Sequence, residues 1–357
     1  MKPYDTKVIR PGQSLEEAAR LLREGQLVSF PTETVYGLGA NALIEDAVRA
    51  IFAAKGRPAD NPLIVHIWPG YDLDQIVEEI PDSAKKLMEA FWPGPLTMSF
   101  RKKDCIPDAT TAGLDTVGIR MPDHPVAQSL LRMSGVPVAA PSANSSGRPS
   151  PTTAQHVWED MKGKIPCIVD GGDCKVGLES TFVDMTGPVP MILRPGAITR
   201  EMLEEVVGRV DVEPSVAKGL AISDEEKPRS PGMKYRHYAP KGQMLLLDGT
   251  MEQKAAWIRK ALEESDEKTG LLISTELKDM IFPSEPVPEA VHLEELGSHQ
   301  DPEEMAHRLF GALRRFDEYR CTRIYGEAFS DTGVEMALMN RMRRAAAGQI
   351  LHLQKGI

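Results

Sequence analysis

Two series of short apolar runs, each alternating with amphipathic helical segments, make up most of this chain. Between them, residues 223–241 are rich in charge, proline and glycine, which is typical of a linker. Strands that alternate with helices predict layered α/β folds. We therefore expect a larger α/β domain over residues 1–212, a linker over 213–241 and a smaller Rossmann-like α/β domain over 242–357.

Length and charge narrow the class of protein. A chain of 357 residues exceeds one typical hydrophobic core, which favours two domains. The formal net charge of −10 argues against general nucleic-acid binding, so an anionic ligand needs a focused group of cations. Four scattered cysteines without a C-x-x-C pair disfavour a disulfide scaffold or a structural zinc. With no apolar leader and no run of membrane-spanning length, we expect a cytoplasmic protein.

The local pattern predicts a helix over residues 14–25, with Ser14 as N-cap, Glu17 completing a capping box and Gly25 as the stop. A strand comes next, and residues 31–41 (PTETVYGLGAN) are expected to form a loop at its end, where α/β proteins bind ligands. The Gly37-x-Gly39 pair in this segment lacks the third glycine of a dinucleotide fingerprint. An ordinary turn remains an alternative interpretation.

Residues 53–67 carry the first candidate cations. Lys55 and Arg57 lie at the end of a helical pattern, and Pro58 and Pro62 stiffen the segment after it. The two cations could offset the helix dipole, or they could form a rigid loop for a polyphosphate. His66 lies in a strand pattern among apolar residues, where a lone histidine is more often structural.

Further polar residues come after other predicted strands. Arg120 and Arg194 each stand at a strand end, where arginine either binds a carboxylate or forms a surface ion pair. Residues 136–154 change from an apolar strand to a run of Ser, Asn, Gly and Pro, which either wraps phosphate oxygens or is a flexible loop. The sequence lacks a Walker A loop, an H-E-x-x-H motif and a G-x-S-x-G elbow.

Together these segments are more specific than any one alone. The K-x-R of Lys55 to Arg57 and the S-x-N of Ser142 to Asn144 match the signature of the YrdC-like family, and the resemblance covers roughly residues 8–208. Further blocks also resemble the family: PTETVYGLGANA, GRPADNPLIVHI, FWPGPLT, PSANSSGRPSPT and LRPGAIT. The linker SPGMKYRHYAP and the later GVEMALMNRMRRAAAG segment resemble the long, two-domain L-threonylcarbamoyladenylate synthases. The implied fold is a twisted, open mixed sheet with a concave cavity, plus the smaller Rossmann-like domain.

The resemblance also implies a reaction. ATP, L-threonine and bicarbonate would give threonylcarbamoyl-AMP and pyrophosphate, for threonylcarbamoyladenosine modification of tRNA. Mg²⁺ would be bound by ATP rather than by protein side chains. The implied partners are the downstream tRNA threonylcarbamoyltransferase machinery and, weakly, tRNA itself, with no membrane.

Site residues are carried over from the matching motifs. The catalytic residues would be Lys55, Arg57, Ser142 and Asn144. ATP would contact Arg57, Asn61, Thr116, Ser142, Asn144, Ser150, Arg194 and Tyr235. L-Threonine would contact Thr34, His66, Arg120, Ala140 and Ser180, with its carboxylate on Arg120.

Two questions stay open at this stage. By resemblance, the aromatic and basic linker closes over the cavity as a lid, with Tyr235 near the nucleotide, although most linkers are passive tethers. The main alternatives to a synthase are a tRNA- or dsRNA-binding protein and a regulatory protein that binds ATP or threonine. A hydrogenase-maturation carbamoyltransferase is disfavoured, because four scattered cysteines do not supply its zinc motifs.

Overall fold

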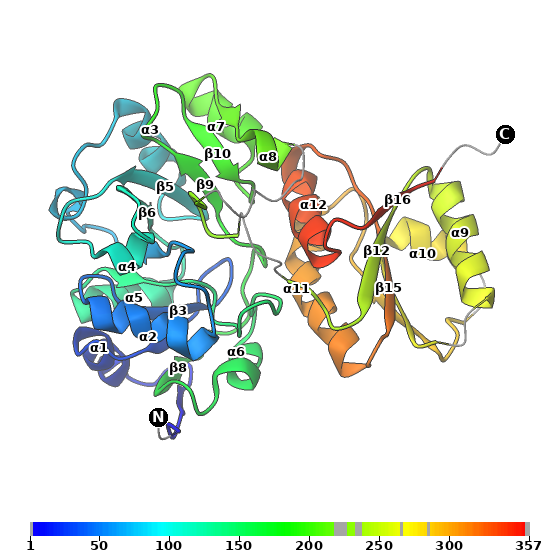
Figure 1. The fold of residues 1–357 in the computed structure, drawn as a ribbon, viewed down its shortest axis with the longest axis horizontal. Helices are drawn as coiled ribbons and strands as arrows, with labels where there is room; N and C mark the ends of the chain where they lie inside the picture. The colour runs from blue at the N-terminus through cyan, green and yellow to red at the C-terminus, as the bar shows by residue number, and fades with distance from the viewer. Residues whose placement is uncertain (1–2, 218–226, 233–237, 265–266, 284–285, 354–357) are drawn as a thin grey trace. The chain divides into compact units, whose positions relative to one another are not determined.

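The computed structural model describes residues 3–217, 227–232, 238–264, 267–283 and 286–353 (Figure 1). The chain divides into two compact units. The first comprises Met1–Ser146 and Ser150–Tyr235, and the second comprises Gly147–Pro149 and Arg236–Ile357. Three residues from the first half of the sequence therefore belong to the second unit.

The first unit is built on one mixed sheet. Within the described part of the chain it has eleven strands, in the order β1-β8-β2-β3-β7-β4-β6-β5-β9-β10-β11. The strands are β1 (Lys7–Ile9), β2 (Val28–Phe30), β3 (Gly37–Asn41), β4 (Ile64–His66), β5 (Leu96–Arg101), β6 (Thr116–Arg120), β7 (Val138–Ala139), β8 (Cys167–Val169), β9 (Thr181–Asp184), β10 (Met191–Arg194) and β11 (Asp211–Val212). Strand β6 pairs parallel with β4 and antiparallel with β5, so the predicted mixed α/β sheet is confirmed.

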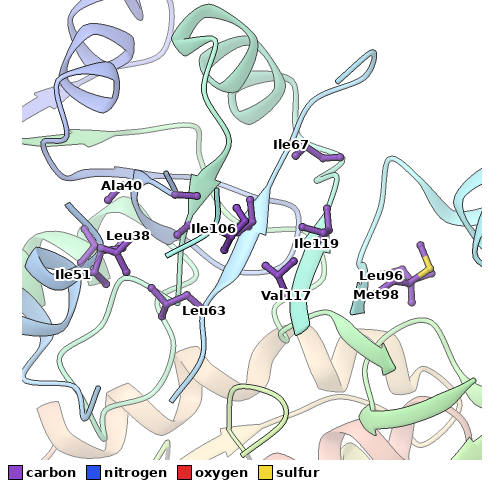
Figure 2. Packing of buried hydrophobic residues seen from close by; sticks show 14 of the residues in the cluster. Leu38, Ala40, Ile51, Leu63, Ile67, Leu96, Met98, Ile106, Val117 and Ile119 are labelled. Carbon is purple, nitrogen blue, oxygen red and sulfur yellow. The ribbon is translucent and has the colours of Figure 1, made fainter. Parts of the chain in front are cut away.

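The helices of this unit connect its strands. They are α1 (Glu16–Arg23), α2 (Glu45–Lys55), α3 (Asp82–Phe91), α4 (Asp108–Thr111), α5 (Pro125–Ser134), α6 (Ala154–Met161), α7 (Arg200–Val207) and α8 (Pro214–Ala217), with a short 3-10 turn η1 (Leu73–Gln75). Leu38 and Ala40 of β3 pack with Ile51 of α2 in the larger hydrophobic cluster, shown in part in Figure 2. Phe30 and Val138 belong to a separate cluster that includes residues of α1 and α5. Because successive strand residues face opposite sides, the sheet separates these two clusters.

Strand β3 corrects the prediction of a loop over residues 31–41. Residues 37–41 form a fully buried strand that pairs antiparallel with β2 and with β7. A Cβ atom on Gly39 would lie 2.7 Å from atoms of both Phe30 and Val138. Gly39 is therefore required by close packing between strands, a use of glycine that sequence pattern does not separate from a turn.

The predicted capping box on the first helix is wrong. Helix α1 begins at Glu16 with Leu15 as N-cap and without a side-chain cap. Ser14 Oγ accepts a hydrogen bond from the Glu16 backbone N–H at 3.2 Å, while Glu17 pairs with Lys7 of β1 at 2.7 Å. Glu17 therefore pairs with Lys7 of β1, a three-residue strand that was not expected, and does not take part in a capping box.

The second unit is a smaller parallel α/β layer. Its described strands are β12 (Gln243–Asp248), β13 (Thr269–Ile273), β14 (Val291–Glu295), β15 (Arg323–Glu327) and β16 (Ile350–His352), in the order β14-β13-β15-β12-β16. Its described helices are α9 (Met251–Glu263), α10 (Thr275–Ile281), α11 (Pro302–Glu318) and α12 (Gly333–Ala345). Each described strand pairing is parallel, which confirms the predicted Rossmann-like class.

The segment Gly147–Pro149 is part of this second unit. Arg314 of α11 is buried and donates from Nη2 to the Pro149 carbonyl at 2.7 Å. The Ala239 backbone N–H donates to the Gly147 carbonyl at 3.2 Å. Hydrogen bonds to main-chain carbonyls thus hold this segment in place, whatever side chains it carries.

Within the described ranges of the chain, none of the helices combines the length and the apolar composition that a membrane-spanning helix needs.

Candidate active site

Lys55 joins the K-x-R and S-x-N segments. It is the last residue of α2, where Gly56 ends the helix in a left-handed conformation. The Lys55 side chain is buried, and its Nζ donates to the main-chain carbonyls of Ser142 and Asn144. The same Nζ lies 3.3 Å from Asn144 Oδ1, and the Ser146 backbone N–H donates to the Lys55 carbonyl at 2.9 Å. Two segments 87 residues apart therefore form one rigid unit around a buried ammonium.

Arg57 and Asn61 lie on the loop after α2. Arg57 Nη2 donates to the Pro62 carbonyl at 3.2 Å, which bends the loop back on itself. Asn61 is 1% exposed, and within the described part of the chain its Oδ1 has no hydrogen-bond partner. Buried polar atoms are nearly always hydrogen-bonded in folded proteins, so Asn61 Oδ1 is suited to accept a bond from a ligand.

Three polar side chains form a row across adjacent strands. In the register of the sheet, His66 of β4 pairs with Arg120 of β6, and Arg120 pairs with Thr97 of β5. Directly paired residues share one face of a sheet, so the three side chains lie next to one another. The structure thus brings together His66 and Arg120, which were both predicted to bind threonine. Thr97, which was not predicted, lies beside them.

His66 is a neutral imidazole. Its ring is buried, and Nδ1 lies 3.2 Å from the Ile64 carbonyl oxygen. Burial, with the charge of Arg120 adding to it, lowers the pKa of His66 to about 3. At physiological pH His66 therefore acts as a hydrogen-bonding group and adds no charge beside Arg120.

Ser180 links the two predicted subsites. Ser180 Oγ lies 2.7 Å from Thr97 Oγ1, next to the row just described. Arg194 of β10 donates from Nη2 to Ser180 Oγ and from Nε to the Ser180 carbonyl, both at 3.1 Å. Ser180 was predicted for threonine and Arg194 for ATP, so the two subsites meet at this serine.

Ser150 has a buried acidic neighbour that sequence reasoning missed. Its Oγ donates to Glu179 Oε1 at 2.6 Å, and both residues are buried. Glu179 directly precedes Ser180 in the chain. A carboxylate between two predicted ligand-binding serines orients the Ser150 hydroxyl, and only its place in the GLEST segment hinted at that role.

Sequence reasoning also missed Glu33. Its Oε1 lies 2.8 Å from Arg120 Nη2, with the side chains only 6% and 4% exposed. Thr34, the next residue and a predicted threonine contact, is fully buried, with its Oγ1 2.9 Å from Thr32 Oγ1. Thr34 therefore directly follows a residue that lies beside Arg120.

The remaining predicted residues have fewer contacts with the residues described above. Ala140 is buried at the end of β7 and its N–H donates to the Ile64 carbonyl at 2.8 Å. Thr116 begins β6, four residues before Arg120, which puts it about 13 Å away along the strand but on the same face. Among the described residues, no hydrogen bond joins the Thr116 side chain to the other predicted site residues. Tyr235 lies outside the described residues.

Residues 227–232 of the linker contact strands β9 and β10. Arg229 forms an ion pair with Asp184 at the end of β9, and Asp184 also accepts from Ser99 Oγ at 3.0 Å. Arg194 Nη1 donates to the Pro231 carbonyl at 3.3 Å, and Ser230 is fully buried. Residues 227–232 are therefore packed within the first unit, next to a predicted ATP-binding arginine.

The side chains of the site are poorly suited to ligating a metal. Among the described residues, no group of three or more His, Cys, Asp or Glu side chains could hold a metal ion. The cationic, amide and hydroxyl groups of Arg57, Asn61 and Ser142 suit phosphate oxygens.

Comparison with known proteins gives consistent results along the whole chain. A family model described as Telomere recombination matches residues 20–196, and one described as Threonylcarbamoyl-AMP synthase, C-terminal domain, matches residues 198–347. A Threonylcarbamoyl-AMP synthase of Bacillus subtilis is 46% identical over 338 residues, which is 94% of each chain. One of Pyrococcus abyssi is 43% identical over 355 residues, covering 97% of this chain and 99% of the relative.

A solved structure agrees with these relatives. The crystal structure of P. abyssi Sua5 complexed with L-threonine superposes with a TM-score of 0.88 at 42% identity, covering 98% of this chain and 99% of that one. The mixed sheet, the joined K-x-R and S-x-N segments and the second parallel unit define a two-domain YrdC-like enzyme with nucleotidyltransferase chemistry. The RNA-binding and purely regulatory alternatives are not favoured, because the relatives are named as synthases. The chain belongs to the threonylcarbamoyl-AMP synthase family, in its two-domain form.

Proposed function

We propose that the chain joins L-threonine, bicarbonate and ATP to give threonylcarbamoyl-AMP and pyrophosphate. Threonine and bicarbonate lose water to give the carbamate, N-carboxy-threonine. A carbamate oxygen then attacks the α-phosphorus of ATP, and the bond to the leaving pyrophosphate breaks. The observation that carries this proposal is the contact of Arg194 with Ser180, which joins a cationic, phosphate-suited region to the row of Thr97, Arg120 and His66.

Each subsite supplies chemistry that the reaction needs. Arg120 offers a planar fork for the threonine carboxylate, and neutral His66 offers a hydrogen bond without extra charge. Arg57 and Arg194 face the growing negative charge of the triphosphate, and the loop from Ser142 to Asn144, fixed by Lys55, supplies hydroxyl and amide groups. Catalysis then consists of positioning and electrostatic stabilisation, and no covalent nucleophile is required.

The proposed cofactor is Mg²⁺, bound to ATP. It would neutralise charge on the leaving pyrophosphate, and it would take phosphate and water oxygens as ligands. The residues that face the triphosphate in this proposal, Arg57 and Arg194, hold the phosphates and leave the metal to the nucleotide.

The proposed partner is the tRNA threonylcarbamoyltransferase machinery, in the cytoplasm. A carbamoyl adenylate is a mixed anhydride that water hydrolyses, so an acceptor enzyme must consume it promptly. The four cysteines are free thiols, which suits a reducing compartment. Any direct tRNA contact is expected to be weak, because the chain carries a formal net charge of −10.

Pyrophosphate release from Mg-ATP tests the proposal when threonine and bicarbonate are omitted one at a time. We expect release only when both are present. Release without threonine would indicate an ATPase or another acceptor. Binding of ATP without any release would reject the synthase reaction.

A further inference from the structure

The pair formed by Glu33 and Arg120 has unused hydrogen-bonding capacity on both sides. Oε1 of Glu33 is 2.8 Å from Nη2 of Arg120, an ion-pair distance. Among the described residues, both Glu33 carboxylate oxygens lack a hydrogen-bond partner. Arg120 Nε and Nη2 lack one as well. Buried polar atoms in folded proteins nearly always have a hydrogen-bond partner. A buried ion pair in which four polar atoms lack one is therefore unusual.

Neighbouring groups do not compensate for these atoms. His66, the register partner of Arg120, is neutral. Burial raises the pKa of the Cys174 thiol, which keeps it uncharged beside the pair. Burial also lowers the pKa of His124, so its ring is a weak source of positive charge for Glu33. The pair therefore presents one positive and one negative group side by side, and neither His66 nor Cys174 adds a charge next to it.

An amino acid zwitterion matches this arrangement. Its carboxylate and its ammonium are attached to the same carbon, so the two charges are as close as those of the pair. A carboxylate that accepts from Nε and Nη2 of Arg120 would use the side of the guanidinium that forms two parallel hydrogen bonds. The ammonium one carbon away would then lie next to the carboxylate of Glu33, which already touches Nη2.

We propose that Glu33 binds the α-ammonium group of the amino acid substrate and selects for it, while Arg120 binds the carboxylate. Glu33 is then a specificity-determining residue, because a hydroxy acid or a plain carboxylic acid leaves its oxygens unsatisfied. Sites built to bond a polar group reject analogues that lack it far more strongly than apolar sites discriminate by shape. This inference rests on the proposed function, in which the substrate of this subsite is L-threonine.

The test compares two ligands with the same carbon skeleton. Binding of L-threonine and of (R)-3-hydroxybutanoate, which is threonine without its amino group, is measured by calorimetry on the full chain and on Glu33→Gln. We expect the wild type to prefer threonine by at least about 100-fold. In Glu33→Gln, threonine should lose most of that advantage while the affinity for 3-hydroxybutanoate stays within about threefold, so that the two ligands bind similarly.

A matched control separates this effect from the loss of any buried ion pair. Glu294 is also a buried glutamate that pairs with an arginine, Arg315, at 2.6 Å, but it lies in the second unit. Glu294→Gln should leave the preference for threonine unchanged. Thermal unfolding of both variants shows whether they are folded, and Glu33→Asp, which keeps the charge, should restore part of the preference.

Three results would overturn the inference. If Glu33→Gln weakens both ligands equally, Glu33 only positions Arg120. If the preference survives in Glu33→Gln, Glu33 does not contact the ammonium. If the wild type binds both ligands with equal affinity, the pair of Glu33 and Arg120 does not recognise the amino group. Failure of the proposed function shows separately, as a wild-type chain that releases no threonine-dependent pyrophosphate.

Discussion

The buried ammonium of Lys55 is bonded to the main-chain carbonyls of Ser142 and Asn144. Its donors go to the backbone of the S-x-N loop, so Lys55 sets the shape of that loop as well as its charge. A buried amine with oxygen acceptors on two sides is costly to replace, since either partner left alone loses its hydrogen bonds.

Replacing Lys55 with Met should therefore damage both stability and activity. We expect a loss of about 1–3 kcal/mol in the free energy of unfolding, because carbonyl oxygens are left unsatisfied. Pyrophosphate release should fall by about 100-fold or more, because the loop no longer holds its geometry. Lys55→Arg should not rescue it, since a planar fork cannot donate in the directions of a compact ammonium. Wild-type rates in a folded Lys55→Met protein would contradict this role.

Arg194→Lys tests whether the two subsites are coupled at Ser180. Lysine keeps the charge but cannot reproduce both bonds to Ser180 from Nε and Nη2. We expect kcat/KM to fall by about 10–100-fold, with the KM values for ATP and for threonine both raised. Steady-state kinetics with each substrate varied in turn measures this. An effect on ATP alone would show that the serine does not link the subsites.

The low pKa of His66 makes stability depend on pH. With a pKa of about 3 in the folded chain and an ordinary value near 6.5 when unfolded, the unfolded state binds the proton more readily. The stabilisation from neutral His66 is complete above pH 6.5 and is lost as pH falls from 6.5 towards 3. When the pH is lowered from 7 to 5, the free energy of unfolding of His66→Gln should fall by roughly 2 kcal/mol less than that of the wild type. Urea unfolding at both pH values measures the difference, and parallel losses would refute it.

Two glycine substitutions separate packing from backbone strain. A Cβ on Gly39 would lie 2.7 Å from Phe30 and Val138, whereas a Cβ on Gly56 meets nothing within 4 Å but sits at a φ of +64°. Gly39→Ala should lower the free energy of unfolding by about 2–4 kcal/mol, because the added methyl group overpacks the space between the strands. Gly56→Ala should cost only about 1–2 kcal/mol, because alanine must adopt the left-handed conformation. Chemical denaturation of both variants measures the two losses. A larger loss in Gly56→Ala than in Gly39→Ala would show that the sheet shifts to make room for a methyl group at position 39.

The outline of the fold could be predicted because the long helices have a clear hydrophobic periodicity in the sequence. Helix α2 has clear periodicity, and it ends at Lys55, where the sequence pattern places the end of a helix. Strand β3 was missed because its glycines serve contacts with Phe30 and Val138 that are formed only in the folded sheet. The strand order of each unit depends on long-range pairing, on which a local pattern carries no information.

The candidate site divides in the same way. Arg120 and His66 could be nominated from their motifs, and the register confirms that they are neighbours. Glu33 could not, because a glutamate between two threonines looks like a solvated turn until its burial against Arg120 is known. Arg229 was likewise indistinguishable from the other charges of the linker before its contact with Asp184 was seen.

Arg314 and Pro149 are separated by 165 residues, yet one hydrogen bond joins them. Ribosomes extend a chain at roughly 5–20 residues per second, so the acceptor waits about 8–33 seconds for its donor to be synthesised. Meanwhile most of the first unit has already emerged, including Lys55 and the S-x-N loop. The segment Gly147–Pro149 is therefore among the last parts of the first half of the chain to settle during synthesis. A truncated nascent chain would carry the proposed catalytic residues Lys55, Arg57, Ser142 and Asn144 without the contact that fixes this segment.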